Sequence, residues 1–333
     1  MVNTRKCSFS SSKSSLKKLC SNDYSMHDLG SSFPNATGHP DGRDEYMPVE
    51  ECGNMLIMGL ALVNSLIYDT EPASIWSQAG KYTVDKLTGS AFPLSIDAKG
   101  MDDTFGGPVH AKGEKQARKW VEKSYPLWKQ WTGYLVREAL IPSNQLSTDD
   151  FAGWLANQTN LALKGIIGIR AMSEISELVG ETKDAKYYRN VSEHYIQMWQ
   201  DDFAISRDGT HAKLAYTWFG SWTTLYNLFA DSLLCFHLPS SSSQSRIKGG
   251  SQRPLIELNP SRTSFVDERI YKIQSDWYHS VRQRYGLPLD SRHLYAKSDW
   301  EFFAVAVASN QVREEVVQSI ALWVNETSTG MLI

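Results

Sequence analysis

The sequence predicts an all-α fold: a toroid of helical hairpins of the (α/α)6 type, incomplete at both ends. Two observations predict this fold. Apolar residues recur with a period of about 3.6 residues, and hardly ever with the alternating pattern of a strand. Helices with one wet face also alternate along the chain with helices that are apolar on nearly every side. Stacked helical hairpins produce this alternation of outer and inner helices, with a plain helical bundle or an open solenoid as the alternatives.

Outer helices are predicted where one apolar stripe is flanked by charged and polar residues. Four segments have this pattern, and Pro126 interrupts the first of them. Proline removes a backbone donor and clashes with the preceding turn, so we expect Pro126 to kink that helix or to divide it in two. The four stripes run from Trp120 to Leu135, from Tyr188 to Met198, from Val266 to Val281 and from Val316 to Trp323.

Inner helices are predicted where apolar residues surround the helix axis. Small residues within these segments, such as Gly165 and Gly168, allow neighbouring helices to approach closely. We therefore expect a tightly packed inner layer that is buried on most sides. The four segments are Cys52 to Ile67, Leu161 to Val179, Thr223 to Leu238 and Asp299 to Ala308.

Three segments lack a helical stripe. The first is a basic, serine-rich tail at residues 1–22, which we expect to be disordered. The toroid is predicted to comprise residues 23–333, and the other two segments lie within it. Residues 71–112 and 239–262 are predicted to be irregular insertions, because unstructured loops of this length are uncommon inside compact domains. The predicted organisation is one helical domain with two excursions.

The charge balance argues against two classes of partner. The chain carries 34 Lys and Arg residues against 37 Asp and Glu residues, which gives no electrostatic footprint for nucleic acid or for an anionic membrane. No apolar run reaches the roughly 18 residues of a membrane-spanning helix, so we expect no membrane insertion. Phosphate-binding, dinucleotide-binding and HExxH motifs are absent from the sequence, and we expect neither a cofactor nor a metal ion.

Cysteines and glycosylation sequons bear on the cellular compartment. The four cysteines show neither a CxxC pair nor metal-ligand spacing, and we interpret them as buried, inert thiols rather than as disulfides. The sequence does not begin with a recognisable signal peptide, but its N-glycosylation sequons favour the secretory route. The cysteines are Cys7, Cys20, Cys52 and Cys235, and the sequons begin at Asn35, Asn157, Asn190 and Asn325.

The first cluster of candidate site residues lies at the start of an inner helix. Pro48 suits the first turn of that helix, which places Glu50 and Glu51 near its positive end. This position favours their ionised form and suits a general base or a ligand for a substrate ammonium, although ordinary capping accounts for acidic residues there equally well. Asn54, one turn later in an apolar helix, has no capping explanation and is predicted to bind substrate.

The second cluster surrounds the start of the next inner helix. Asp149 and Asp150 precede this helix and could activate water or hold a substrate amine. Asn160 and Lys164 follow one turn apart and are predicted to bind substrate. A buried ammonium is costly without a partner, so a structural ion pair is the alternative role for Lys164.

The third cluster, Arg292, Lys297 and Asp299, stands directly before or at the start of the last inner helix. We expect these three residues to line the same site. Ser298 is predicted to cap the helix, and Glu301, three residues later, to complete a capping box, which gives Glu301 a structural role.

The three clusters should converge, because each precedes an inner helix and such loops gather at one rim of a toroid. We predict a funnel-shaped pocket of carboxylates, amides and cations at that rim, with Trp154, Trp218 and Trp222 as aromatic walls. Such a lining suits a small, polar molecule or a sugar. The sequence leaves the oligomeric state open.

Distinctive strings in these clusters resemble the fungal glutaminase A family, in particular its central six-helical-hairpin domain. They cover most of the chain. Among them are Met47 to Met58, Ser147 to Gly153, Ala156 to Ile166, Leu225 to Asp231, Tyr285 to His293 and Lys297 to Glu301.

The resemblance implies a secreted or cell-wall-associated hydrolase that releases ammonia from the side-chain amide of L-glutamine. It also implies an incomplete copy of the domain, so an inactive fragment is an alternative. A glycoside hydrolase is the other alternative, because paired carboxylates at the mouth of a helical toroid also cleave sugars. The resemblance supplies no settled catalytic residue, and we assign Glu50 or Asp149 as the base for an attacking water, with Glu51 and Asp150 beside them. The residues assigned to substrate binding are Asn54, Asn160, Lys164, Arg292, Lys297 and Asp299.

Overall fold

A computed structural model describes residues 47–68, 114–147, 152–234, 236 and 264–327 of the chain. The predicted tail at residues 1–22 and the predicted insertions at 71–112 and 239–262 lie outside these residues. Every named element in the described part is a helix, and extended segments there pair only through isolated bridges. The all-α prediction is confirmed. None of the helices described is long and apolar enough to cross a membrane.

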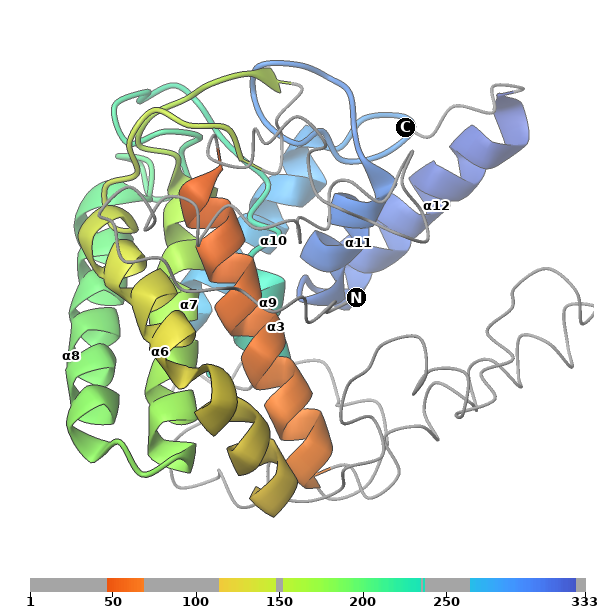
Figure 1. Ribbon diagram of the computed structural model, residues 1–333. Helices are drawn as coiled ribbons and strands as arrows, with labels where there is room; N and C mark the ends of the chain where they lie inside the picture. The colour runs from red at the N-terminus through yellow and green to blue at the C-terminus, as the bar shows by residue number, and fades with distance from the viewer. Residues whose placement is uncertain (1–46, 69–113, 148–151, 235, 237–263, 328–333) are drawn as a thin grey trace, which may run out of the picture.

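The helices form the two layers of a helical-hairpin toroid (Figure 1). Neighbouring inner helices pack in the order α3, α7, α9 and α11. The burial predicted for the last of them is wrong, because only Glu301, Ala304 and Val305 of α11 are buried and Phe302 is 49% exposed. The inner helices are α3 (Pro48–Tyr68), α7 (Thr159–Leu178), the short α9 (Leu228–Leu233) and α11 (Ser298–Ala306). The outer helices are α6 (Glu114–Glu138), α8 (Thr182–Met198), α10 (Glu268–Val281) and α12 (Asn310–Glu326), and a π-helical turn, η4 (Trp199–Phe203), follows α8.

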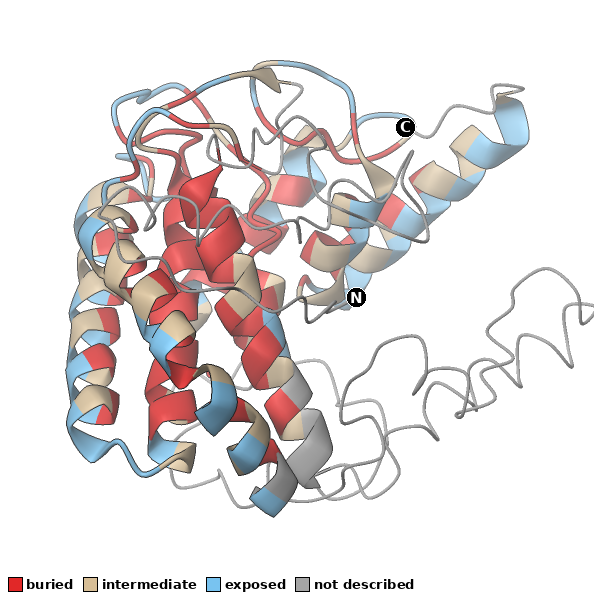
Figure 2. Ribbon diagram, viewed as in Figure 1, coloured by how far each residue is buried: buried red, intermediate tan, exposed pale blue. Residues whose placement is uncertain are grey.

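Helix α7 forms the centre of the core. It packs against α3, α6, α8 and α9, and all its residues except Glu174, Glu177 and Leu178 are buried. Figure 2 shows the contrast with α8, whose outer side is exposed. Burial on all sides explains why the α7 sequence lacks a polar face, whereas α8 needs apolar residues along one stripe only.

Two glycines of α7 allow this close packing. A Cβ atom added to Gly165 would lie 2.5 Å from the Cβ of Ala139, at the end of α6. A Cβ added to Gly168 would lie 3.2 Å from the Cα of Gly53 on α3. The predicted role of these glycines in close helix approach is confirmed.

Helix α6 continues through Pro126 without a break, so the alternative in which proline divides it is wrong. The residues that follow the proline are held in the core, where Trp128, Trp131 and Leu135 are at most 5% exposed. Burial of these large side chains stabilises the second half of the helix by several kcal/mol in total, roughly 1.5–3 kcal/mol for each, enough to offset the lost hydrogen bond.

The inner helix predicted for residues 223–238 is wrong in its first turns, because only α9 is helical there. The backbone N–H of Thr224 donates to the carbonyl oxygen of Leu289 at 2.8 Å, and that of Leu225 donates to the Tyr278 hydroxyl at 2.9 Å. These bonds to distant parts of the chain satisfy donors at the point where a helix was expected to start. The helix therefore begins only at Leu228.

Cys52, on α3, is disulfide-bonded, so its interpretation as an inert thiol is wrong. Its side chain is fully buried in the apolar part of the helix. In sequence, such a position looks the same for a free thiol and for a disulfide, because only the spatial partner distinguishes the two.

Replacing Gly165 with valine should lower the free energy of unfolding by about 1–3 kcal/mol, because the new side chain overlaps Ala139. Urea denaturation monitored by circular dichroism measures this change. Gly133, within α6, is the matched control, since a Cβ there meets only the Arg137 Nη1 atom at 4.0 Å. Gly133→Ala should be neutral or stabilising by up to about 1 kcal/mol. Similar losses in both variants would contradict the close contact at Gly165.

Candidate functional site

The start of α3 and the second turn of α7 meet in a buried ion pair. Pro48 opens α3, as predicted, and Glu50 follows in the first turn. The Lys164 ammonium pairs with Glu50 Oε1, and the two side chains are 5% and 1% exposed. Asn54, one turn further along α3, donates from Nδ2 to the same oxygen at 3.3 Å. The structure thus brings three of the predicted site residues together.

Gly53 makes room for the lysine. A Cβ atom at this position would lie 2.7 Å from Lys164 Cγ, so a larger residue would push the lysine stem away from α3. Withdrawing two charges from water costs several kcal/mol for each ion, and good pairing geometry is needed to compensate. The ion pair therefore depends on the close approach of the two helices. Glu50 is the ion-pair partner that the sequence analysis expected for Lys164 in its structural role.

Of the remaining acidic candidates for catalysis, Glu51, Asp149 and Asp150, the structure describes only Glu51. Glu51 is 2% exposed, and its backbone N–H donates to the carbonyl oxygen of Met47 at 3.0 Å, which starts the helical hydrogen bonding of α3. Asp149 and Asp150 lie outside the described residues. Of the two residues considered for the base, the structure places Glu50 alone.

Asn160 stands one turn before Lys164 on α7 and is tied to Asn227, directly before α9. The backbone N–H of Asn227 donates to Asn160 Oδ1 at 3.3 Å, and Asn227 Nδ2 donates to the Asn160 carbonyl oxygen at 2.8 Å. Both side chains are buried. The sequence analysis missed Asn227, although an amide within the apolar string 225–231 was the signal that could have found it.

Two glutamines join the first turn of α3 to the loop before α7. Gln145 Oε1 accepts from the backbone N–H of Val49 at 2.9 Å, and the Gln145 carbonyl oxygen accepts from Gln158 Nε2 at 2.9 Å. Both glutamine side chains are buried. Because Val49 precedes Glu50 and Gln158 precedes Asn160 by two residues, these bonds hold the first and second clusters at the same rim.

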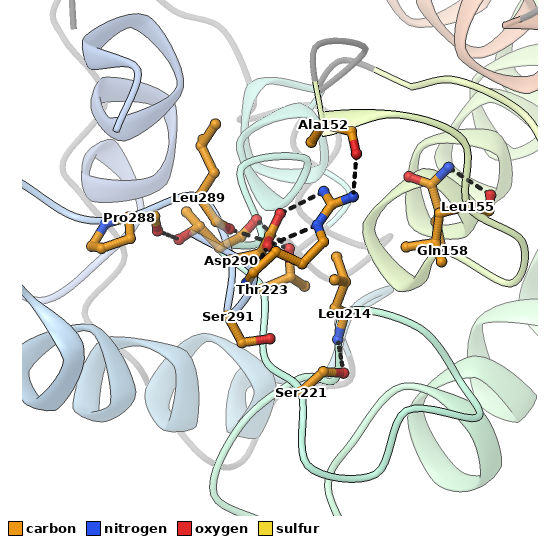
Figure 3. A network of polar contacts seen from close by, with 12 residues as sticks. Ala152, Leu155, Gln158, Leu214, Ser221, Thr223, Pro288, Leu289, Asp290 and Ser291 are labelled. Carbon is orange, nitrogen blue, oxygen red and sulfur yellow. Dashed lines mark hydrogen bonds and ion pairs between the residues drawn. The ribbon is translucent and has the colours of Figure 1, made fainter. Parts of the chain in front are cut away.

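Arg292 joins the third cluster to the second. Its guanidinium binds both carboxylate oxygens of Asp290, at 2.9 Å from Nε and 2.7 Å from Nη2, and donates from Nη1 to the Ala152 carbonyl oxygen at 3.2 Å (Figure 3). A bidentate arginine of this kind fixes geometry. The arrangement favours a loop clamp for Arg292 over direct contact with substrate.

Lys297 and Asp299 lie nearer to solvent. Their charged atoms are 3.9 Å apart, and the side chains are 31% and 58% exposed. The Lys297 ammonium also stands 5.4 Å from the centre of the Trp300 ring. These two residues mark the outer edge of the third cluster, in contrast to the buried pair between α3 and α7.

The predicted capping box at α11 is wrong. Lys297 occupies the N-cap position instead of Ser298, and no side chain caps the helix there. Glu301 is fully buried, and its Oε1 accepts a hydrogen bond from the backbone N–H of Leu287. Gly286 is needed beside it, since a Cβ there would lie 2.2 Å from that oxygen. Glu301 thus fastens the preceding loop to α11.

Two surface hollows lie on other parts of the rim loops. Neither of these two hollows is lined by Glu50 or Lys164, whose side chains are buried between α3 and α7. In the same part of the chain, no group of three or more His, Cys, Asp or Glu residues could hold a metal ion. The first hollow, of about 380 Å³, is lined by Ser206, Arg207, Asp208, His211 and Phe219. The second, of about 280 Å³, is lined by Gln283, Arg284, Tyr285, Gly286, Leu294, Tyr295, Ala296 and Trp323.

Two buried carboxyl groups have pKa values well above the usual range for such groups. Burial raises the pKa of Glu301 to about 7, although the bond from Leu287 acts in the opposite direction. Burial also raises the pKa of Asp231, on α9, to about 7, against the effect of the Tyr271 hydroxyl at 2.5 Å and of the Arg170 charge. The folded chain therefore binds more protons at these two groups than the unfolded chain does between about pH 4 and pH 7.

Stability should consequently fall as the pH rises. The contribution of Glu301 and Asp231 is fully present below their unfolded pKa values and is lost as the pH rises through about 7. We expect the melting temperature to drop by several degrees between pH 5 and pH 8, and the Glu301→Gln/Asp231→Asn double variant to flatten this drop. Asp208→Asn is the control, because hydrogen bonds from Ser206 and Thr210 lower the pKa of Asp208 to about 2, outside this window. A melting temperature that rises with pH would contradict the assignment.

Comparison with known proteins places these features in a family. The description "Glutaminase A six helical-hairpin domain" belongs to a family profile that matches residues 12–81, 109–246 and 260–333. A probable glutaminase from Arthroderma benhamiae is 58% identical over 323 residues, covering 92% of this chain and 36% of that protein. Glutaminase A from Aspergillus oryzae is 38% identical over 311 residues, covering 93% of this chain and 34% of that protein.

The chain thus spans about a third of the length of these two curated relatives. No solved structure matches it. The family profile covers most of the chain, and it includes α3, α7 and α11 with the residues of the ion pair. The resemblance drawn from the motifs is confirmed, and the chain belongs to the glutaminase A six-helical-hairpin domain family.

Proposed function

We propose that the chain is part of an enzyme that hydrolyses the side-chain amide of L-glutamine and releases ammonia. Two relatives named as glutaminases, at 58% and 38% identity, support this proposal. The structural observation that carries it is the buried ion pair of Glu50 and Lys164, with the amides of Asn54 and Asn160 within one helical turn. This set combines a carboxylate, an ammonium and amides, the groups that amide hydrolysis of an amino acid requires.

Glu50 is the base in this proposal. Water attacks the Cδ carbon of the substrate while the Glu50 carboxylate takes a proton from the water. The bond between Cδ and the amide nitrogen then breaks, the proton passes to the nitrogen, and glutamate and ammonia leave. The Lys164 ammonium and the Asn54 amide both contact Glu50 Oε1 and hold the carboxylate in place. Asp149 is the other candidate for this step.

Substrate binding is divided among the remaining residues. Lys164 can pair with the substrate carboxylate, and Asn54 and Asn160 can bind its polar groups through their amides. Arg292 acts indirectly, because its donors are engaged by Asp290 and Ala152. Its contribution to binding is to hold the loop before α11 against the loop before α7.

We also propose that the chain follows the secretory route. The disulfide at Cys52 supports this, because disulfides persist in oxidising compartments. The sequon residues Asn190, on α8, and Asn325, on α12, have exposed side chains that a glycan could occupy. Treating the secreted protein with an N-glycosidase tests this placement, since unchanged electrophoretic mobility would contradict it.

Ammonia release from L-glutamine by the purified protein tests the proposed activity. Glu50→Gln should lower kcat/KM by about 100-fold or more, because a general base is lost. Asp149→Asn should be measured beside it as the alternative base. Glu177→Gln is the matched control: Glu177 pairs with Arg189 at 2.7 Å with a side chain 60% exposed, and its loss should leave activity unchanged.

The same preparations should be offered oligosaccharides, with reducing sugar as the readout. Ammonia from glutamine without reducing sugar supports the amidase. Full glutaminase activity in both Glu50→Gln and Asp149→Asn would contradict the assignment of the base. Release of reducing sugar alone would replace the proposal with a glycoside hydrolase.

A further inference from the structure

The carboxamide of Asn160 can adopt only one orientation in its surroundings. A backbone N–H can only donate, so the Asn160 atom that faces the N–H of Asn227 at 3.3 Å is the oxygen Oδ1. The nitrogen Nδ2 therefore points the other way. It is buried and meets no acceptor among the residues that the structure describes. Leaving a buried amide donor unsatisfied costs about 1–3 kcal/mol, so a bound acceptor at this atom would be favourable.

The end of α7 favours an acceptor with negative charge. Gln158, the N-cap residue, makes no side-chain capping bond. Its Nε2 donates instead to the carbonyl oxygens of Gln145 and Leu155, both at 2.9 Å. The partial positive charge at the start of this 20-residue helix is therefore left without an acidic cap.

We propose that Asn160 is a catalytic residue that donates a hydrogen bond from Nδ2 to the amide oxygen of the substrate, and that Asn227 is the positioning residue that holds Asn160 in this orientation. The inference rests on the proposed glutaminase activity. The carbonyl oxygen gains negative charge as the water–carbon bond forms and loses it when the carbon–nitrogen bond breaks. A fixed donor aimed at that oxygen stabilises the transition state more than the ground state.

Asn227 suits its role because it contacts Asn160 twice. Its backbone N–H binds the side-chain oxygen, and its own Nδ2 binds the Asn160 carbonyl oxygen at 2.8 Å. The bond from Asn227 Nδ2 keeps the Asn227 backbone N–H opposite Asn160 Oδ1, because both donors belong to Asn227. Without it, the Asn160 carboxamide can rotate and present its oxygen, which would repel the charge that develops on the substrate.

Asn160→Asp isolates the donor. Aspartate keeps the size of the side chain and an oxygen for the N–H of Asn227, but it offers no donor to the substrate. We expect kcat to fall by about 100- to 1000-fold with a much smaller change in KM. Thr159→Val is the matched control: Thr159 is fully buried in the same turn, and its bonds to Leu214 and Trp199 use backbone atoms that valine retains. It should leave kcat unchanged.

A double-mutant cycle tests the positioning role. Asn227→Leu removes the bond to the Asn160 carbonyl oxygen and should lower kcat by about tenfold, and Asn227→Gln, which retains an amide donor, should restore part of it. If Asn227 acts through Asn160, Asn227→Leu causes little further loss in the Asn160→Asp background. An equal loss in both backgrounds would overturn the positioning role.

A binding readout separates this inference from the proposed activity. L-Glutamate, the expected product, carries a side-chain carboxylate oxygen in place of the amide oxygen. In protein labelled with 15N-asparagine, the Asn160 side-chain amide should shift on addition of L-glutamate, in the parent and in Thr159→Val alike. If the parent protein releases no ammonia, the proposed function is wrong. A shift of the Asn160 amide signal would in that case still support Asn160 as the donor to a bound acyl oxygen. No shift, with the donor held by an ordered water only, would overturn the inference.

Discussion

The ion pair of Glu50 and Lys164 fixes how α3 and α7 lie against each other, and the rest of the rim depends on that arrangement. An ammonium and a carboxylate that are 5% and 1% exposed must meet, because either charge alone would cost several kcal/mol in the interior. Apolar contacts tolerate a helix sliding by a fraction of a turn, whereas a paired charge does not. The pair therefore specifies one register for two helices whose sequences are otherwise almost uniformly apolar.

Glycines and amides extend this register to the surrounding loops. Gly53 and Gly168 bring the helix backbones within reach of each other, and the lysine stem lies against Gly53. Gln145 and Gln158 then join the first turn of α3 to the loop that precedes α7. Each step is a buried polar contact with a defined partner, so a shift in the ion pair would be transmitted to the rim.

Most of the fold could be predicted because it follows from local pattern. The difference between α7 and α8 is a difference in how many sides of a helix are apolar, and periodicity reports this directly. The need for a partner at Lys164 was also evident, since a cation on a buried helix must be paired. Its identity was not, because Glu50 is 114 positions away in the sequence.

Two of the failures share one cause, which is competition from distant parts of the chain. Glu301 has the spacing of a capping box, but the loop at Leu287 brings an N–H to the same carboxylate. Residues 223–227 have the composition of a helix, but the backbone N–H groups of Thr224 and Leu225 donate to Leu289 and Tyr278. Local sequence carries no information about these partners.

In the proposed reaction, the catalytic groups are ones that the fold already holds in place. A carboxylate fixed by a lysine, and an amide fixed by Asn227, are preorganised before any substrate arrives, which lowers the reorganisation needed during the reaction. Preorganisation also suits the placement of Glu50 on α3 and of Asn160 and Lys164 on α7. The outer residues Lys297 and Asp299 are, by contrast, partly exposed, with side chains that are 31% and 58% exposed.

The coupling energy between Glu50 and Lys164 tests the central claim most directly. It is obtained from the free energies of unfolding of the parent, Glu50→Met, Lys164→Met and the double variant. The account predicts that each single variant loses about 3–5 kcal/mol, because it strands a buried charge, and that the double variant regains most of that loss. Additive losses, with the double variant the least stable of the four, would contradict it.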